Sequence, residues 1–238
     1  MSRKRTVSII IPAYNEAAFI SQVVEKVSQA DTLGLAKEII AVDDGSTDKT
    51  ASILKRLKPR FPNLKVIHLP RNLGKGAAVK RALLKSTGGI IIIQDADLEY
   101  SPDDYPTLLQ PIISGLADVV YGSRFISHRP HRVLYFWHYQ ANKWLTTLSN
   151  MFTNLNLTDM ETGFKVFRGD LLRQLAPSLK SQGFNFEPEV TAKIAKQPNL
   201  RIYEVGISYH GRTYEEGKKI NWVDGIKAAV AIVYFHFF

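Results

Sequence analysis

The chain has 238 residues, 45% of them hydrophobic and 22% charged, which is enough for a substantial core and is typical of a globular protein. It contains no cysteine, which excludes disulfides, thiolate catalysis and sulfur-ligated zinc and suits a reducing compartment. The net charge of +9 favours anionic partners. Because the sequence shows no nucleic-acid-binding motif, we expect phosphates or lipid headgroups and no nucleic acid.

The apolar runs are short. Residues 7–11 follow a basic amino terminus but are too few for the core of a signal peptide. The longest run, residues 228–238, is well below the roughly 18 residues that a membrane-spanning helix requires. We therefore expect no transmembrane segment.

Short runs rich in β-branched residues alternate with amphipathic stretches through the first half of the chain. The predicted strands are residues 7–11, 38–42, 65–68, 90–94 and 118–121, and the predicted helices are about 16–30, 47–58, 75–87 and 103–115. This βαβα order predicts an α/β fold with a mostly parallel sheet flanked by helices. From about residue 122 we expect loops, a long helix and short elements around 164–175 and 200–209. No repeat or low-complexity linker suggests a second domain.

The long helix predicted over residues 133–152 has an apolar stripe at helical spacing. Such a stripe more often forms core than a lipid groove, and both interpretations stay open. Its members are Leu134, Trp137, Ala141, Trp144, Leu145, Leu148 and Phe152.

The last segment, residues 222–238, places several apolar residues on one helical face, with lysines nearby. This pattern suits either an interfacial helix lying on a membrane or a helix docked on the sheet. The face comprises Trp222, Ile226, Val230, Val233 and Phe237, and the lysines are Lys218, Lys219 and Lys227.

Carboxylates follow the buried strand of four isoleucines that begins at Ile90. The carboxyl end of a parallel strand lies at the edge where open α/β sheets bind ligands. In extended chain, residues two apart share a side, so Asp95, Asp97 and Glu99 are expected to converge. Mg²⁺ shared with a diphosphate is the natural occupant, because this ion uses one or two carboxylates plus phosphate oxygens. The alternative is an acidic loop that caps the helix following Pro102.

Two further loops follow predicted strands. In the first, Pro12 ends a strand, Tyr14 could lie along a base or ribose, and Glu16 could accept from ribose hydroxyls or cap the next helix. In the second, a single serine or threonine would suffice as N-cap, so Asp43 and Asp44 look surplus to structure and suit a base or ribose.

A third loop, residues 71–78, contains glycines on both sides of Lys75. Glycines before a helix permit close backbone approach, and the helix N-terminus attracts phosphate. Lys75 beside a diphosphate and simple packing of the helix on the sheet are both compatible with this pattern.

These loops continue in order with residues 122–125 (Gly-Ser-Arg-Phe), 161–168 (Glu-Thr-Gly-Phe-Lys-Val-Phe-Arg) and 212–218 (Arg-Thr-Tyr-Glu-Glu-Gly-Lys). The set, spanning about residues 7–220, resembles the family 2 glycosyltransferases of GT-A fold, and within them the dolichol-phosphate mannose synthase-like, or polyprenyl-phosphate glycosyltransferase, group. The resemblance implies one GT-A domain over residues 1–220, with a nucleotide-sugar half over about 1–121 and an acceptor half over about 122–220. Residues 221–238 would form a C-terminal amphipathic helix.

The resemblance also implies roles for particular residues. Asp97 would bind Mg²⁺ or Mn²⁺, joined by Glu99, where many relatives have Gln. Arg124 would meet the acceptor phosphate or the donor diphosphate, and Arg212 and Lys218 would neutralise the leaving diphosphate. The nucleoside pocket would be lined by Pro12, Tyr14, Glu16, Val42, Asp44, Asp95 and Ala96.

The implied reaction moves a hexosyl group, with inversion, from a nucleotide diphosphate sugar of the GDP-mannose or UDP-glucose type to a polyprenyl or dolichyl phosphate. Many relatives carry hydrophobic spans that this sequence lacks. Attachment to the cytoplasmic face of a membrane would therefore be peripheral or through a membrane partner protein.

Three alternatives remain at this point. A saccharide hydroxyl acceptor, in cell-envelope polymer synthesis, would need a general base, for which Glu161 is the best candidate. A non-catalytic nucleotide-sugar-binding module is disfavoured by the intact charged residues. Nucleotidyl transfer is disfavoured because no Gly-rich basic loop follows the first strand.

Overall fold

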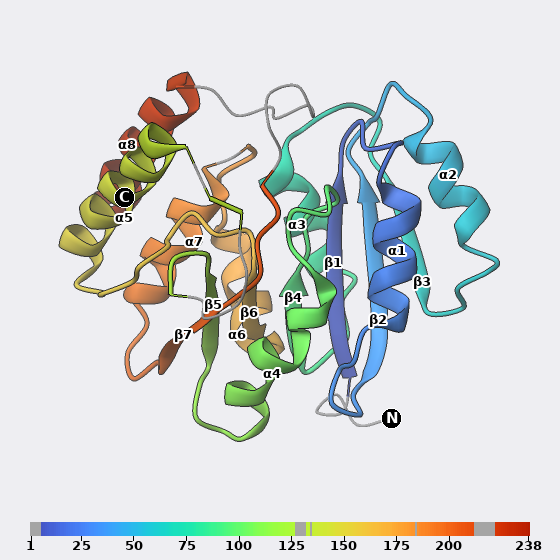
Figure 1. Cartoon of the computed structure of the whole chain (residues 1–238), viewed down its shortest axis with the longest axis horizontal. Helices are drawn as coiled ribbons and strands as arrows, with labels where there is room; N and C mark the ends of the chain where they lie inside the picture. Colours follow the sequence, from blue (N-terminus) through green and yellow to red (C-terminus); the bar gives the residue numbers. More distant parts are fainter. Residues whose placement is uncertain (1–5, 127–131, 134, 184, 212–221) are drawn as a thin grey trace.

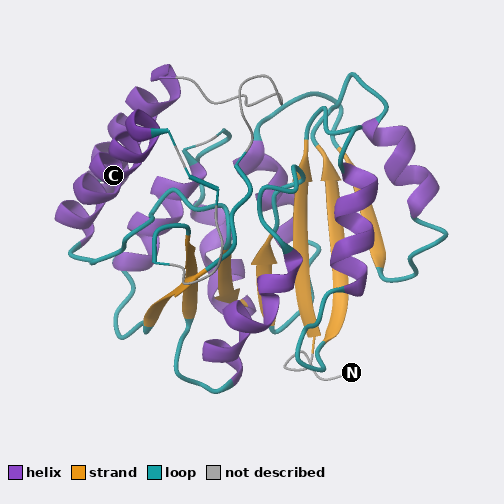
Figure 2. Cartoon of the chain, in the orientation of Figure 1, coloured by secondary structure: helices purple, strands orange, loops and turns teal. Residues whose placement is uncertain are grey.

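A seven-stranded sheet in the order β3-β2-β1-β4-β6-β5-β7 forms the centre of the molecule, and helices cover both of its faces (Figures 1 and 2). The computed structural model describes residues 6–126, 132–133, 135–183, 185–211 and 222–238. The strands are β1 (Thr6–Ala13), β2 (Ala36–Asp43), β3 (Leu64–His68), β4 (Ile90–Ile93), β5 (Val119–Ser123), β6 (Lys165–Arg168) and β7 (Ile202–Gly206). The helices are α1 (Ile20–Gln29), α2 (Thr50–Leu57), α3 (Lys75–Leu83), α4 (Tyr105–Ile113), α5 (Phe136–Thr153), α6 (Gly169–Leu175), α7 (Phe186–Ala195) and α8 (Trp222–Phe237), with the short 3₁₀ helices η2 (Pro102–Asp104) and η3 (Ala176–Ser178).

The sheet is mostly parallel, as predicted. Strand β1 pairs in parallel with β2 and β4, β2 with β3, and β5 with β7. Strand β6 alone runs antiparallel, between β4 and β5. Its amino-terminal end therefore lies at the edge where β4 and β5 end, and this brings residues 161–164 to the ligand edge of the sheet.

The core has two layers, one on each face of the sheet. Because neighbouring residues of a strand point to opposite sides, Ile9 packs with α1, α2 and α4, whereas Ile10 packs with α3, α6 and α7. Both isoleucines are fully buried. Burial on both faces explains why the strands read as continuous apolar runs.

All five predicted strands and all four predicted helices of the first half are confirmed, and the elements expected around 164–175 and 200–209 are β6, α6 and β7. Helix α7 was not anticipated. Its residues are buried all round, including Glu187 and Glu189, so it lacks the one-sided apolar period by which an amphipathic helix is recognised.

Helix α5 corrects the interpretation of its stripe as core. Leu145 is buried, and Leu148 and Phe152 pack against the core. Trp137 and Trp144, however, are 78% and 59% exposed. The second half of the stripe is therefore core, whereas Trp137 and Trp144 face outward. Leu134 lies outside the described residues.

Helix α8 packs on α5 and α7 (Figure 1). It docks through Ala228, Ala231, Ile232 and Phe235, all buried. The apolar face predicted from the sequence is a different one: Ile226 and Val230 are 55% and 64% exposed. The helix is thus docked and still presents an outward apolar face. Among the described residues, no helix combines the length and apolar character needed to cross a membrane.

Candidate functional site

The loops after β1 and β2 are tied together at the carboxyl edge of the sheet. Asn15 adopts a left-handed conformation with φ of 53°. Its side-chain Oδ1 accepts from the Thr47 amide at 2.9 Å, and its own amide donates to Ser46 Oγ at 3.0 Å. Tyr14, 37% exposed, therefore projects from a fixed loop, as a residue that stacks on a base or ribose must.

Asp43 and Asp44 are not surplus to structure, and that part of the sequence argument is wrong. Asp43 accepts from the Ser46 amide at 3.2 Å and pairs with His68 Nδ1 at 2.5 Å. Asp44 accepts from the amides of Leu73 and Gly74 at 2.9 and 2.7 Å. Both carboxylates are buried, and each joins the β2 loop to the chain that leaves β3.

The acidic segment after β4 is a turn rather than extended chain. Leu98 lies in the left-handed region with φ of 62°, which is strained for a residue other than glycine. The Glu99 amide donates to Asp97 Oδ1 at 3.2 Å, and Glu99 Oε2 accepts from Tyr209 at 2.8 Å. Within the described part of the chain, no three acidic or histidine side chains converge on a metal position. The expected convergence of three carboxylates is therefore wrong.

Asp95, in the same loop, forms an ion pair with Lys75, the first residue of α3. The Lys75 ammonium lies 2.7 Å from Asp95 Oδ1 and 2.8 Å from Glu187 Oε1 of α7. Burial alone would lower the pKa of Lys75, but the two carboxylates raise it above its ordinary value. Lys75 is thus a permanent cation that joins α3, α7 and the β4 loop.

The turn before β6 lies directly against the β4 loop. The Gly163 amide donates to the Tyr100 hydroxyl at 2.9 Å. A Cβ at Gly163 would lie 2.1 Å from Asp95 Oδ2, a distance that no side chain can accommodate. Glycine is therefore required for this close approach.

Arg124, after β5, is buried in a bidentate pair with Asp159. Its Nε and a terminal nitrogen each lie 2.6 Å from an Asp159 oxygen. Its guanidinium also stacks over the Tyr209 ring at 5.2 Å. Asp159 holds the pKa of Arg124 above its usual range against the opposing effect of burial. A guanidinium has five N–H donors in a planar fork, so this pair fixes its plane without exhausting its donors.

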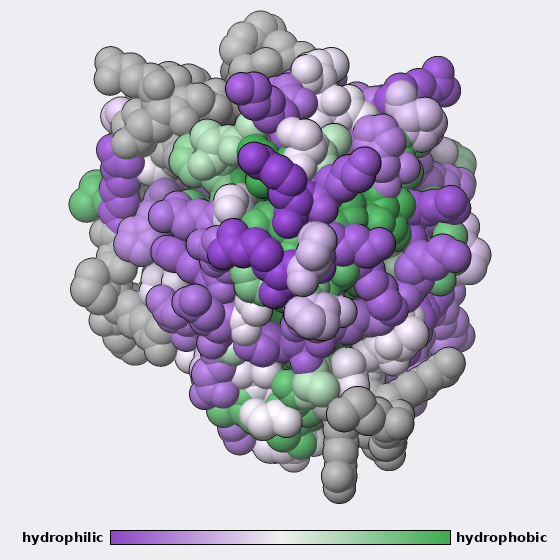
Figure 3. Space-filling model, turned by 90° about the vertical axis from the view of Figure 1, so that its right-hand side faces the viewer, coloured by the Kyte–Doolittle hydropathy of each residue, from purple (hydrophilic) through white to green (hydrophobic). Residues whose placement is uncertain are grey.

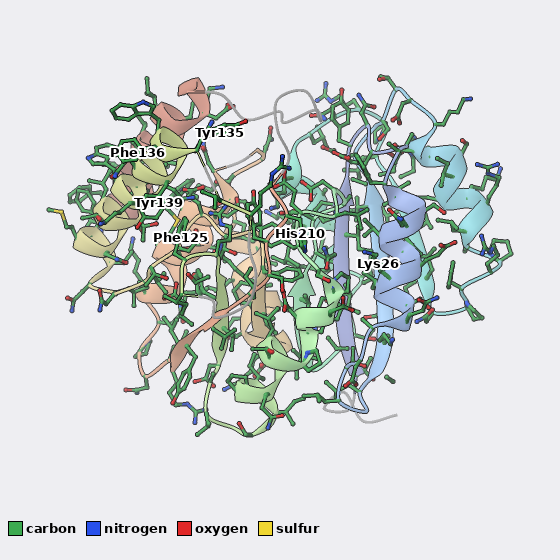
Figure 4. The ribbon with its side chains drawn as sticks, in the orientation of Figure 1. Lys26, Phe125, Tyr135, Phe136, Tyr139 and His210 are labelled. Atoms are coloured by element: carbon green, nitrogen blue, oxygen red, sulfur yellow. The ribbon has the colours of Figure 1, made fainter. Side chains whose placement is uncertain are left out.

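An open pocket of about 450 Å³ lies beside Arg124. Its lining combines two arginines with aromatic rings and one valine. Figure 4 shows Phe125, Phe136 and Tyr139 gathered near the start of α5, with His210 nearer the middle of the molecule. The lining residues are Arg124, Phe125, Arg132, Val133, Phe136, Tyr139 and Tyr209.

Glu161 and Lys165, on either side of the glycine turn, have displaced pKa values. Burial, followed by the Glu187 charge, raises the pKa of Glu161 to about 7. Burial, with Lys75 nearby, lowers the pKa of Lys165 to about 8. Burial thus shifts the pKa values of both groups toward neutrality.

The structure brings most of the sequence-predicted site residues to one edge. Pro12 and Val42 are paired across β1 and β2, and Ala96 is buried beneath the β4 loop. Glu16 donates its amide to Thr50 Oγ1 at 2.9 Å, at the entry to α1. Arg212 and Lys218 lie outside the described residues.

Sequence reasoning missed Asp159 and Glu187, the partners of Arg124 and Lys75. Asp159 could have been found from its position shortly before the Gly163 turn, since the buried arginine after β5 needs an anion nearby. Glu187 gave no such signal because α7 itself was not recognised.

The fold and this edge define an α/β glycosyltransferase of the GT-A type. The chain belongs to glycosyl transferase family 2, whose family model matches residues 8–176. The chain is 27% identical over 240 residues to a dolichyl-phosphate beta-glucosyltransferase, ALG5D, of Trichomonas vaginalis, covering 95% of this chain and 72% of that protein. It is 28% identical over 238 residues to a UDP-N-acetylglucosamine–dolichyl-phosphate N-acetylglucosaminyltransferase of Methanococcus voltae, covering 94% and 93%.

Among solved structures, the fold matches glucosyl-3-phosphoglycerate synthase from Mycobacterium tuberculosis, crystallised with Mn²⁺, UDP and glucosyl-3-phosphoglycerate. The TM-score is 0.73 at 22% identity, and the match covers 98% of this chain and 80% of that one. At this identity the likeness shows the shared fold. Together with the family it makes this protein a glycosyltransferase, which sets aside the non-catalytic module and nucleotidyl transfer.

Proposed function

We propose that this enzyme transfers a hexosyl group, with inversion, from a nucleotide diphosphate sugar to a polyprenyl or dolichyl phosphate, with the help of a divalent metal ion. The observation that carries the proposal is the pocket of arginines and aromatic rings beside Arg124, which follows β5. Arginine recognises phosphate in a bidentate manner, and aromatic and aliphatic surfaces suit an isoprenoid chain. The two dolichyl-phosphate transferases named above support the same acceptor class.

The donor would occupy the β1, β2 and β4 side of the edge. Tyr14 and Asp44 lie on loops that the hydrogen bonds above hold in place, and Ala96 closes the floor. The proposal keeps both donor types, GDP-mannose and UDP-glucose. The two dolichyl-phosphate relatives do not agree on a sugar, since one is named for glucose and the other for N-acetylglucosamine.

The acidic turn fits a divalent cation through its donor set. Asp97 and Glu99 offer only carboxylate oxygens, are partly exposed, and stand on either side of the strained Leu98. Mg²⁺ and Mn²⁺ prefer such ligands and take further oxygens from a diphosphate. When bound, the ion would supply Lewis-acid neutralisation of the leaving diphosphate. In this proposal Asp97 and Glu99 hold the metal, and Arg212 and Lys218 assist it.

A phosphate acceptor is already anionic at neutral pH, so this chemistry needs no strong general base. What the protein must supply is alignment of the acceptor phosphate with the anomeric carbon. Arg124, fixed by Asp159, would provide that alignment together with Arg132, which also lines the pocket.

We further propose that α5 and α8 rest on the membrane that holds the acceptor. Their outward faces expose Phe136, Trp137, Trp144, Val230 and Phe237. Exposed aromatic residues beside Lys143 and Lys227 suit the interface of an anionic bilayer. In contrast, the face that carries α2 and β3, on the far side of the molecule, is mainly hydrophilic around smaller apolar areas (Figure 3).

The first experiment incubates the enzyme with Mn²⁺ or Mg²⁺, dolichyl or undecaprenyl phosphate, and radiolabelled GDP-mannose, UDP-glucose or UDP-N-acetylglucosamine in parallel. We expect label to enter the organic phase with one donor. Arg132→Gln should raise KM for the lipid phosphate by about tenfold or more while KM for the donor stays unchanged. Arg56→Gln, an exposed arginine on α2, is the matched control.

A donor that binds with metal while no lipid is labelled would overturn the lipid acceptor. The saccharide hydroxyl alternative would then stand, with Glu161 as the base, since a pKa of about 7 suits that role.

A further inference from the structure

Glu161 occupies the middle of the ligand edge. It precedes Gly163, whose amide bonds Tyr100 beneath the β4 loop. It follows Asp159, which holds Arg124 beside the aromatic pocket. The segment between these two contacts therefore joins the proposed metal and diphosphate side to the proposed acceptor phosphate side.

One oxygen of the Glu161 carboxylate has no hydrogen-bond partner among the described residues, although several cations lie nearby. This oxygen, Oε1, is buried. The nearby cations are engaged elsewhere: Lys165 donates to the Thr162 carbonyl, and Arg124 pairs with Asp159. Lys75 pairs with Asp95 and Glu187.

Leaving such an acceptor unpaired is destabilising, and more so when the group is charged. Violations of this kind concentrate at functional sites, where a ligand supplies the missing donor. The side chain as a whole is only partly buried. Its terminal torsion is soft and two-fold, so either carboxylate oxygen can face the edge.

The transfer reaction fixes what lies above this segment. The anomeric carbon must stand between the leaving diphosphate and the incoming phosphate, so the hexose ring covers the residues that join the two sides. The ring carries several hydroxyl groups, each a hydrogen-bond donor. We propose that Glu161 binds one hydroxyl of the transferred hexose and thereby selects the donor sugar. This inference rests on the proposed function.

The test measures donor binding by calorimetry with Mn²⁺ and without acceptor, first for UDP-glucose, UDP-N-acetylglucosamine and GDP-mannose. The monodeoxy analogues of the tightest donor follow. We expect one analogue to bind wild type about tenfold or more weakly than its parent, because a site built for a hydroxyl rejects the ligand that lacks it. In Glu161→Leu the parent donor and that analogue should bind with equal affinity. Asp170→Asn, an exposed carboxylate paired with Arg168, should behave as wild type.

Glu161→Gln guards against misfolding of the leucine variant, since it keeps the size and an acceptor oxygen. In this variant the parent donor and that monodeoxy analogue should differ less in affinity than they do in wild type, because a neutral acceptor binds more weakly than a charged one. If both folded variants discriminate against every analogue as wild type does, the role of Glu161 is overturned while the proposed function stands. If wild type binds none of the donors, the proposed function falls and the inference with it.

Discussion

Charged side chains at the carboxyl edge are mostly held by a named neighbour before any substrate arrives. Asp159 fixes Arg124, and Asp95 with Glu187 fixes Lys75. Charges arranged in advance need little reorganisation when charge develops on a leaving group. The rigidity of these pairs is therefore part of what a transferase needs from this edge.

Replacing Asp97 tests the metal assignment most directly. Asp97→Asn should lower kcat by about a hundredfold or more, since it weakens the group that neutralises the diphosphate, while circular dichroism and Tm stay unchanged. Asp103→Asn is the control, because Asp103 is exposed in the same acidic stretch and bonds Ser101. Transfer by Asp97→Asn at the wild-type rate would remove Asp97 from the site.

The raised pKa of Glu161 makes a prediction about stability. A carboxyl whose folded pKa of about 7 exceeds its ordinary 4.5 stabilises the fold below 4.5 and loses that stabilisation as pH rises through 7. The groups that face it are Glu187, Lys165, Arg124 and Asp159. The Glu161→Gln side chain stays neutral at every pH. The Tm of this variant minus the Tm of wild type should therefore increase from pH 5 to pH 8. A constant difference across this range would contradict the buried carboxyl.

Among the structural elements, the turn into β6 makes the closest contact. Gly163→Ala places a methyl group against Asp95 Oδ2, which should displace Asp95 from Lys75. We expect donor affinity to fall by up to about a hundredfold, measured by calorimetry with Mn²⁺. Gly183→Ala is the matched control, because a Cβ there meets nothing within 4 Å. Equal donor affinity in the two variants would show that the turn before β6 can accommodate a methyl group without displacing Asp95.

The two faces of α8 should respond differently to a charge. Val230→Glu, on the exposed face, should reduce cosedimentation with anionic vesicles and leave Tm unchanged. Ala231→Glu, on the docked face where alanine is 3% exposed, should lower Tm instead, because it buries an unpaired charge. Unchanged vesicle binding by Val230→Glu would argue that this face meets something other than lipid.

For the whole molecule, the site predicts a linkage between metal, donor and stability. A donor at a hundred times its Kd adds about 2.7 kcal/mol to the free energy of unfolding, which for a chain of this size corresponds to a Tm shift of about 5–10 °C. EDTA should abolish the shift, and Mn²⁺ or Mg²⁺ should restore it. A shift that survives EDTA would mean that the donor binds without metal.

The sheet could be predicted from the sequence because its strands are buried on both faces and are separated by amphipathic helices. The direction of β6 could not be predicted. Around residues 164–175 the sequence predicted only short elements, and nothing in the local sequence shows in which direction a strand there would run. Helix α7 was not predicted because Glu187 and Glu189 are buried, so its buried positions do not show the apolar spacing of an amphipathic helix.

The edge of the sheet at which the candidate side chains gather could be predicted, but the partners of those side chains could not. Asp43 and Asp44 looked available because most of their partners, His68, Leu73 and Gly74, lie 25 to 30 residues along the chain. The prediction of extended chain after β4 was wrong because the backbone turns at Leu98. The first error arose because a local pattern does not show contacts between distant segments, and the second because an unusual backbone conformation at a leucine has no signature in the sequence.

The reversed direction of β6 has a consequence for how relatives can diverge. Its first residues, not its last, would lie beneath the substrate in the proposed complex, because they stand opposite the ends of β4 and β5. The connection that precedes them, residues 154–164, runs to this edge from the end of α5. Insertions or deletions in that connection would raise or lower the floor under the sugar while the register with β4 and β5 stays fixed. Length variation at this one crossing is therefore a route to new sugar specificity that leaves the core untouched.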